Sequence, residues 1–165
     1  MDHLKNQVVL ECERIEEDSE QSAKRHFNAA SRWSSYNGWL GIPSVVIAGI
    51  ASAVSFAALP VLSGIFAATA AALTAVLTFL KPAERSASHN SYGNQYLRLR
   101  NETRLFREVE LPTIKQADEL SERFKPFAER RDDLNDGAPM TTDQDYTKAN
   151  RGILDGQTEY KADKK

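Results

Sequence analysis

The stretch WLGIPSVVIAGIASAVSFAALPVLSGIFAATAAALTAVLTFL, residues 39–80, decides the fold because it contains no Asp, Glu, Lys or Arg. The charge-free run covers the 48 residues from 33 to 80, so all 44 formal charges lie in the other 117 residues. A helix that crosses a bilayer needs about 20 apolar residues. We therefore expect an all-α membrane protein with a two-helix transmembrane hairpin at residues 36–80, whose spans, residues 39–59 and 61–80, are divided at Pro60.

A buried hairpin of a water-soluble protein is the alternative, because both segments are rich in Ala, Gly, Ser and Thr. A hairpin of that kind normally keeps a polar stripe toward water, and neither segment offers a charged group on any face. A secretory signal is not expected, since 35 mostly polar residues precede the apolar run.

The flanks of the run carry residues that usually mark a membrane surface. Aromatic rings precede the first span and a lysine follows the second, so the predicted interface residues are Trp33, Tyr36, Trp39 and Lys81. Basic residues lie before the first span and after the second, but not in the turn. The positive-inside rule then places both termini in the cytoplasm and the turn outside.

Two sets of small residues follow the spans at helical spacing. The first is expected to pack helices closely and consists of Gly49, Ala53, Gly64, Ala68 and Ala72. The second carries hydroxyls and is the candidate pore lining: Ser44, Ser52, Ser55, Thr74 and Thr78, among other small residues. Two interpretations stay open, hydroxyls that bond back to their own helix or several hairpins whose hydroxyl faces share a wettable lumen. The spans contain no ionisable residue, which argues against a proton relay or an ion-coupled transporter.

Residues 1–35 and 81–165 are expected to form amphipathic cytoplasmic helices, because their apolar residues recur every three or four positions. One helix should precede the hairpin and three should follow it. The first of these covers residues 91–111 and is interrupted at Pro112. The second starts at a capping box of Thr113 and Gln116 and ends at residues 135–139. The third follows a turn at residues 139–142 and carries Tyr160 on its apolar stripe.

The sequence lacks the patterns typical of enzymes, such as a phosphate-binding glycine loop, a nucleophile elbow or zinc-ligand spacing. We expect no catalytic residue, no cofactor and no metal, and the formal charge of −2 gives no indication of nucleic-acid binding. His89 is expected to form hydrogen bonds at the interface or between subunits rather than to act as a base. The single cysteine, Cys12, excludes an internal disulfide and is expected on an apolar helix face.

The order of elements resembles the SLATT family, the SMODS and SLOG associating two-transmembrane effectors of prokaryotic conflict systems. A polar helix and a small-residue hairpin are followed by FLKPAERSASHNSYGNQYLRLRNE, residues 79–102. The resemblance covers nearly all of residues 1–165, and DYTKANRGILDGQTEY, residues 145–160, is similar to the family's last helix. The residues that match the family's juxtamembrane pattern are Pro82, Arg85, His89, Tyr96 and Leu99.

This resemblance implies a single-domain effector that assembles as a homo-oligomer in the lipid bilayer of the bacterial inner membrane. Such an effector opens a pore or disrupts the membrane during anti-phage defence. No fused nucleotide-binding or synthase domain is recognised in residues 1–165. A separately encoded sensor or nucleotide-second-messenger synthase, or the cytoplasmic helices themselves, would therefore supply the trigger, and coupling to the hairpin would pass through a hinge at residues 81–91. The alternative is a membrane-tethered helical scaffold that does not conduct.

Overall fold

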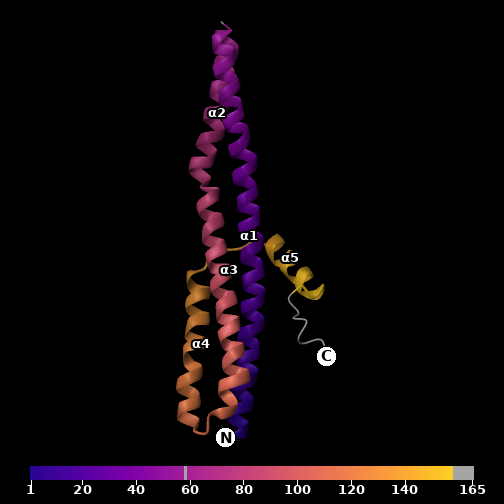
Figure 1. Ribbon diagram of the computed structural model, residues 1–165, viewed down its shortest axis with the longest axis vertical. Coiled ribbons are helices and arrows are strands. Elements are labelled where there is room, and N and C mark those ends of the chain that lie inside the picture. Colours follow the sequence, from indigo (N-terminus) through magenta and orange to yellow (C-terminus); the bar gives the residue numbers. More distant parts are fainter. Residues whose placement is uncertain (58, 158–165) are drawn as a thin grey trace. The chain divides into compact units, whose positions relative to one another are not determined.

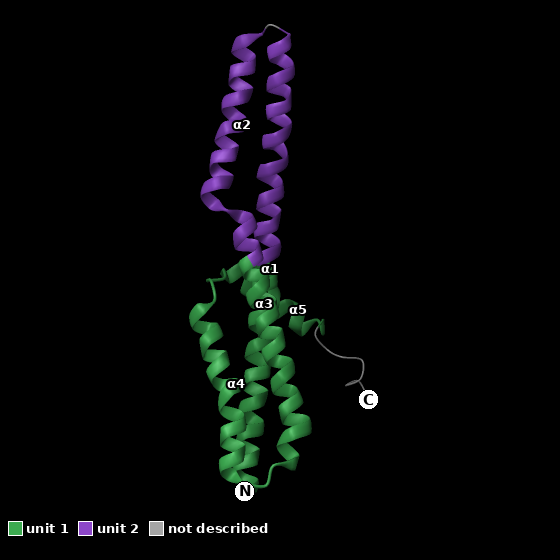
Figure 2. Cartoon of the chain, turned by 60° about the vertical axis from the view of Figure 1, so that its left-hand side comes forward, with its two compact units in different colours: residues 1–29, 88–165 green, residues 30–87 purple. Residues whose placement is uncertain are grey.

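The computed structural model describes residues 1–57 and 59–157, and every regular element in that part of the chain is helical. The main helices are α1 (Asp2–Phe56), α2 (Pro60–Leu80), α3 (Pro82–Leu105), α4 (Ala117–Gly137) and α5 (Asp143–Leu154) (Figure 1). The chain divides into two compact units (Figure 2). Unit 1 comprises Met1–Ala29 and Ser88–Lys165, and unit 2 comprises residues 30–87.

Helix α1 is continuous from Asp2 to Phe56, so the polar N-terminal segment and the first apolar segment are one helix. Pro43 lies inside it without ending it. Helix α2 begins with Pro60, whose fixed φ and missing N–H suit the first helical position. Helix α2 ends where Lys81 adopts a left-handed conformation with φ 47°, directly before Pro82. Because a proline disfavours the right-handed helical conformation in the residue before it, the sequence Lys81-Pro82 separates α2 from α3.

Unit 1 is built around helices α1, α3 and α4, which Figures 1 and 2 show side by side. Its core contains two apolar clusters. One joins the start of α1 to the end of α3 and the start of α4, with Val8, Cys12, Phe106, Leu111, Ile114 and Leu120. The other lies further along the helices and contains Ile15, Ala23, Tyr96, Leu99 and Leu134. The apolar spacing in the sequence therefore corresponds to real core positions.

The end of α3 differs from the expected interruption. A π-helical turn (Phe106–Glu110) and a 3-10 turn (Leu111–Thr113) follow α3, because Pro112 cannot continue the α-helical hydrogen bonds. The predicted capping box is wrong. The Thr113 hydroxyl donates to the carbonyl oxygen of Glu110 at 2.7 Å, and Gln116 precedes α4 without a side-chain cap. The expected end of α4 within residues 135–139 is confirmed, because α4 ends at Gly137.

Helix α5 starts at a capping box that was not predicted from the sequence. The Thr142 hydroxyl accepts from the backbone N–H of Asp145, and the Asp145 carboxylate accepts from the N–H of Thr142 at 3.0 Å. This pair satisfies two backbone donors that a helix start leaves unpaired. Tyr160, which we expected on this helix, lies outside the described residues.

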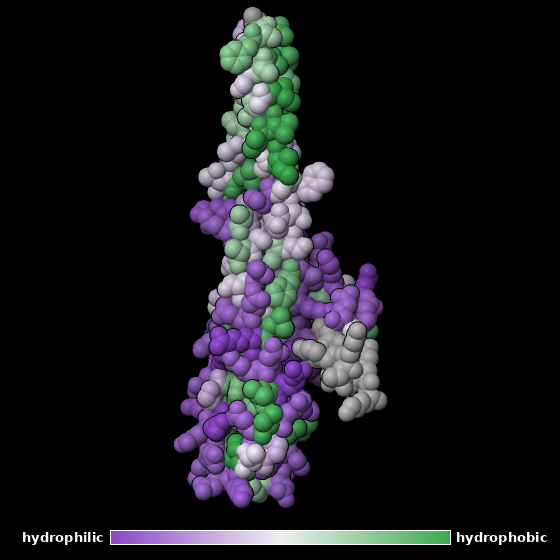
Figure 3. Space-filling view, in the orientation of Figure 1, coloured by the Kyte–Doolittle hydropathy of each residue, from purple (hydrophilic) through white to green (hydrophobic). Residues whose placement is uncertain are grey.

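Unit 2 contains the apolar segments of α1 and α2, residues 39–56 and 60–80, which we call the apolar hairpin. Helices α1 and α2 are long and apolar enough to cross a membrane. Only 11% and 6% of the residues in their most apolar stretches are buried. Figure 3 shows apolar side chains exposed along this segment. A hairpin in the core of a soluble protein would be mostly covered, and within the described chain this hairpin is not.

Candidate functional site

The two helices of the apolar hairpin meet along a regular seam. The covered positions alternate every three and four residues, a coiled-coil spacing, and are Ser44, Ile47, Ala51 and Val54 in α1, and Ser63, Phe66, Ala70, Leu73 and Leu77 in α2. Hydrogen bonds across the seam supplement this packing. The Ser44 hydroxyl lies 2.7 Å from the Thr74 hydroxyl and 3.2 Å from the carbonyl oxygen of Ala70. The Ser63 hydroxyl donates to the carbonyl oxygen of Ala51 at 3.0 Å.

These contacts change the assignment of one candidate pore-lining residue, Ser44, and give two others, Thr74 and Thr78, a bond to their own helix. Ser44 is only 6% exposed and faces α2, so within one hairpin it joins the helices and does not line a lumen. Thr74 contacts Ser44 and also donates to the carbonyl oxygen of Ala70, one turn earlier, at 2.9 Å. Thr78 is exposed and bonds back to the carbonyl oxygen of Thr74 at 2.9 Å. Back-bonding was one of the two interpretations that the sequence left open.

A groove runs beside the seam and is lined by Ser52, Ser55 and Thr74 of the predicted hydroxyl set. Its volume is about 540 Å³. Ser52 and Ser55 lie in this groove, between small residues of both helices: Ala48, Ala51, Ala67, Ala70 and Ala71. Within the described chain, neither serine hydroxyl forms a hydrogen bond, in contrast to Ser44 and Ser63 across the seam. The groove is therefore the place where the hairpin presents unpaired hydroxyls on an otherwise apolar surface.

The small residues predicted to pack the helices do not pack them against each other. Gly49, Ala53, Gly64, Ala68 and Ala72 are all exposed, on the faces turned away from the seam. A Cβ atom added at Gly49 or Gly64 would meet nothing within 4 Å. The prediction is wrong for the hairpin itself, because the alanines buried in the seam are Ala51 and Ala70. These outer residues are free surface in a single chain.

Aromatic and basic residues cluster at the open end of the hairpin, and they include the residues predicted to lie at a membrane interface. The rings of Trp33 and Tyr36 pack edge to face with centroids 5.7 Å apart. The guanidinium groups of Arg85 and Arg32 lie 4.8 Å and 5.5 Å from the Trp33 ring centroid. Cation–π contacts of this kind join an apolar ring to a charge that favours water. Lys81 is exposed and forms an ion pair with Glu84 at 3.1 Å.

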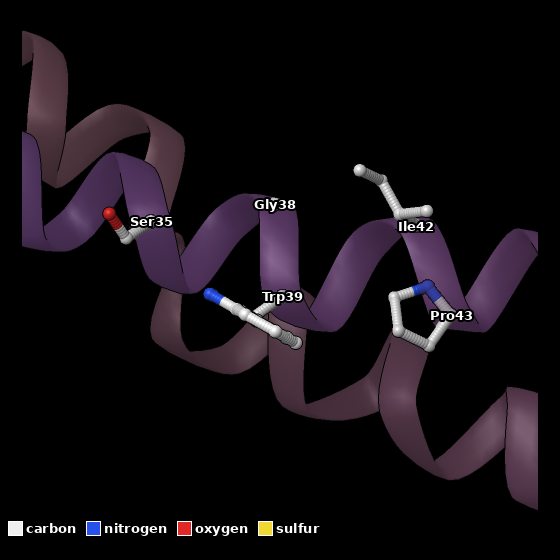
Figure 4. A pocket seen from close by; sticks show the side chains of 5 residues that line it. All are labelled: Ser35, Gly38, Trp39, Ile42 and Pro43. Atoms are coloured by element: carbon white, nitrogen blue, oxygen red, sulfur yellow. The ribbon is translucent and has the colours of Figure 1, made fainter.

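Trp39 is 80% exposed and borders a shallow pocket of about 390 Å³. The pocket is lined by successive turns of α1, with Ser35, Gly38, Trp39, Ile42 and Pro43 (Figure 4). Its surface is apolar apart from the serine hydroxyl. A large exposed indole beside an apolar pocket is typical of the boundary between water and hydrocarbon.

In unit 1, His89 pairs with a residue that the sequence did not connect to it. The Nδ1 atoms of His26 in α1 and His89 in α3 lie 3.0 Å apart, and each histidine is only 4% exposed. The rings of Tyr92 and Tyr96 stack on His26, with centroids 5.9 Å and 5.5 Å away. The Tyr96 hydroxyl donates to the Asn135 side-chain oxygen at 2.9 Å, which ties α3 to α4.

His26 is held in its neutral form. Burial, together with the nearby His89 and Arg25, lowers the pKa of His26 from 6.5 to about 4. One imidazole must donate through Nδ1–H and the other must accept, and two protonated rings would both be donors. The pair is therefore a structural hydrogen bond in a protected environment rather than an accessible general base.

The other predicted coupling residues are mainly structural. Pro82 is buried at the start of α3, and Leu99 is fully buried in the core of unit 1. Near Pro82, the Ser86 hydroxyl donates to the carbonyl oxygen of Ala30 at 2.8 Å, which joins α3 to α1 within unit 2. Cys12 is also fully buried, and burial together with Glu16 raises its pKa to about 12, so it is an unreactive core thiol.

Comparison with known proteins adds no relative: no protein-family model, curated protein or solved structure gives a significant match to this chain.

Proposed function

We propose that the chain is an integral membrane protein whose apolar hairpin crosses a bilayer twice, and that several copies assemble into a pore or a membrane-disrupting effector. The exposed apolar surface supports membrane insertion. In the most apolar stretches of α1 and α2, only 11% and 6% of the residues are buried, so in water the rest would be in contact with solvent. In a bilayer this surface faces lipid at no cost, whereas in water it would drive aggregation.

The observation that carries the assembly step is the hydroxyl-lined groove. Ser52 and Ser55 present hydroxyls that no described residue satisfies. An unpaired polar group in hydrocarbon is unfavourable, and small residues let a second helix approach closely. A second hairpin or water in a shared lumen would satisfy these hydroxyls. Both termini face the cytoplasm in this proposal, and unit 1 receives the signal from a separately encoded sensor or a nucleotide messenger, as in the SLATT effectors that the sequence resembles.

A membrane-tethered scaffold is the second candidate. The observation in its favour is an exposed apolar pair on unit 1, Leu105 and Val109, which are 56% and 58% exposed and one helical turn apart. Exposed apolar side chains at this spacing are typical of a helix face that binds another protein. In this case the hairpin only anchors unit 1.

Two measurements separate these functions. In a Cys12→Ala background, Ser52→Cys should form disulfide-linked dimers in native membranes. The control Thr69→Cys should not, because Thr69 bonds to its own helix at Ile65 and lies on the opposite side of α2 from the groove. Vesicles that contain the wild-type chain should then leak potassium, and Ser52→Leu, which fills the groove, should reduce the leak.

Each outcome has a distinct meaning. Crosslinking at Ser52 with vesicles that stay tight would contradict conduction and favour the scaffold. Equal crosslinking at Ser52 and Thr69 would contradict the groove as the assembly surface. A leak that Thr69→Leu reduces as much as Ser52→Leu would mean that the groove does not shape the conducting path.

A further inference from the structure

The geometry points to a binding site for a small phosphate-bearing anion in unit 1, in the pocket between α1 and α5. The pocket has a volume of about 490 Å³, within the usual range of roughly 300–1,000 Å³ for small-molecule sites. Both of its walls belong to unit 1, and it is separate from the hairpin groove. The inference therefore does not depend on membrane insertion or conduction.

Helix α5 is firmly placed against α1. Its buried residues Asp145, Ala149 and Gly152 recur at four and three positions, which defines one face of the helix. Asn28 in α1 donates its side-chain N–H to the carbonyl oxygen of Asp145 at 3.1 Å. The guanidinium of Arg25 lies 5.3 Å from the ring centroid of Tyr146. These contacts fix the distance between the two walls of the pocket.

The end of α5 turns a polar side chain into the pocket. Gly156 has φ 71°, a conformation that glycine adopts without strain. The N–H of Gln157 donates to the carbonyl oxygen of Gly152 at 3.1 Å, and the N–H of Gly156 donates to that of Ile153 at 2.9 Å. This pair of bonds is a Schellman motif, which satisfies the last carbonyls of the helix. The carbonyl end of α5 is thus closed, so it does not repel an anion through unpaired oxygens.

The absence of a side chain at Gly152 leaves space for the side chains of Gln157 and Lys24 to contact each other. The Gln157 side-chain oxygen lies 3.4 Å from Lys24 Nζ. A Cβ atom added at Gly152 would lie 2.7 Å from that oxygen and 3.0 Å from Lys24 Nζ. Both atoms are the ends of flexible side chains, so an alanine at this position would displace them without unfolding the helix. Gly152 and Gly156 therefore shape the pocket.

The charge of the pocket identifies the ligand class. Among the described residues, three cationic side chains line it, Lys24, Lys148 and Arg151, against one carboxylate, Asp155. Within the described chain, none of these three cations forms an ion pair, whereas Arg107, Arg123 and Arg130 all do. Lysine and arginine together are the usual ligands of phosphate oxygens, and a net positive pocket favours an anion with more than one charge. The aromatic ring of Phe27 and the amide of Asn28 complete the lining.

The test uses the full-length chain in nanodiscs of phosphatidylcholine, with inorganic pyrophosphate as the probe. Amide hydrogen exchange of residues 143–157 should slow on addition of pyrophosphate, and titration calorimetry should give saturable binding that weakens with salt. Lys148→Gln with Arg151→Gln should weaken binding at least about tenfold, since each 1.4 kcal/mol is a factor of ten. Lys125→Gln is the control, because Lys125 is an exposed lysine of α4 paired with Glu129.

Gly152→Ala is the second variant. It should weaken pyrophosphate binding while the thermal unfolding temperature stays close to that of the wild type, because only side-chain ends move. A third arm replaces phosphatidylcholine by phosphatidylglycerol. Protection of residues 143–157 by that lipid alone, abolished by the double variant, would assign the phosphate to a lipid headgroup and support the site. The inference would be overturned if neither pyrophosphate nor phosphatidylglycerol slowed amide exchange of residues 143–157. It would also be overturned if Lys125→Gln weakened pyrophosphate binding as much as the double variant does.

Discussion

Acidification should destabilise unit 1 through the buried histidine pair. The folded protein keeps His26 neutral with a pKa of about 4, whereas the unfolded chain takes up a proton near pH 6.5. Between these values the unfolded state binds more protons, so the contribution of His26 is complete above pH 6.5 and is lost as the pH falls toward 4. A difference of about 2.5 in pKa corresponds to about 3 kcal/mol at most.

The groups around His26 determine the direction in which its pKa shifts. Arg25 in α1 and His89 in α3 oppose its protonation, and burial among Tyr92 and Tyr96 adds the largest effect, whereas Asp145 in α5 favours the charged form. Removal of the Asp145 carboxylate would therefore lower the pKa of His26 further and would not protect the fold at acidic pH.

Thermal unfolding in a non-ionic detergent, followed by circular dichroism at pH 7.0, 5.5 and 4.5, measures the effect. His26→Phe keeps an aromatic ring between the tyrosines but does not titrate. This variant should be less stable than the wild type at pH 7, because His89 loses its hydrogen-bond partner, and its stability should change less between pH 7.0 and 4.5. His3→Gln is the control, because His3 is exposed. An identical pH dependence in His26→Phe and the wild type would refute the reasoning.

Two further predictions concern packing and charge in unit 1. Gly93→Ala should destabilise the protein by about 1–3 kcal/mol, since the new Cβ would lie 2.7 Å from the ring of Phe27; Gly49→Ala, with nothing within 4 Å, should be neutral or slightly stabilising in the same denaturation experiment. Glu16→Gln should cost about 1–3 kcal/mol, because Arg107 donates to both carboxylate oxygens of Glu16 at 2.8 Å and 3.1 Å in a half-buried position. A loss below the roughly 0.5 kcal/mol typical of exposed pairs would show that solvent screens this contact.

The sequence predicted the helical class, the two apolar segments and the aromatic and basic flanks, because each of these depends on composition and local spacing. It could not predict that the polar start of α1 and the first apolar segment form one unbroken helix, because no glycine or proline pattern decides between a break and a continuation there. Pro43, the residue that could have ended the helix, lies within it.

The hydroxyl residues show where spacing arguments fail. Ser44 and Ser52 are eight positions apart, and at 3.6 residues per turn they differ in direction by about 80°. One of them therefore faces α2 and the other faces the groove, although a repeat of four residues groups them on one stripe. Likewise, His89 has an identifiable partner only once the rotation of α1 against α3 is known, because His26 is 63 positions away.

Pro43 restricts how deep the hairpin can lie in the proposed bilayer. Proline has no N–H, so the carbonyl oxygen of Trp39, one turn earlier, has no helical donor. Hydrocarbon cannot hydrate that oxygen, so in the proposed bilayer it is most stable at the level that water reaches. Gly41 lies beside Leu77, since a Cβ atom added there would be 3.8 Å from the leucine side chain, so this level is also close to Lys81 on the returning helix. A missing hydrogen bond in one helix and a charge on the other thus define the same plane and limit how far the hairpin can slide across the membrane.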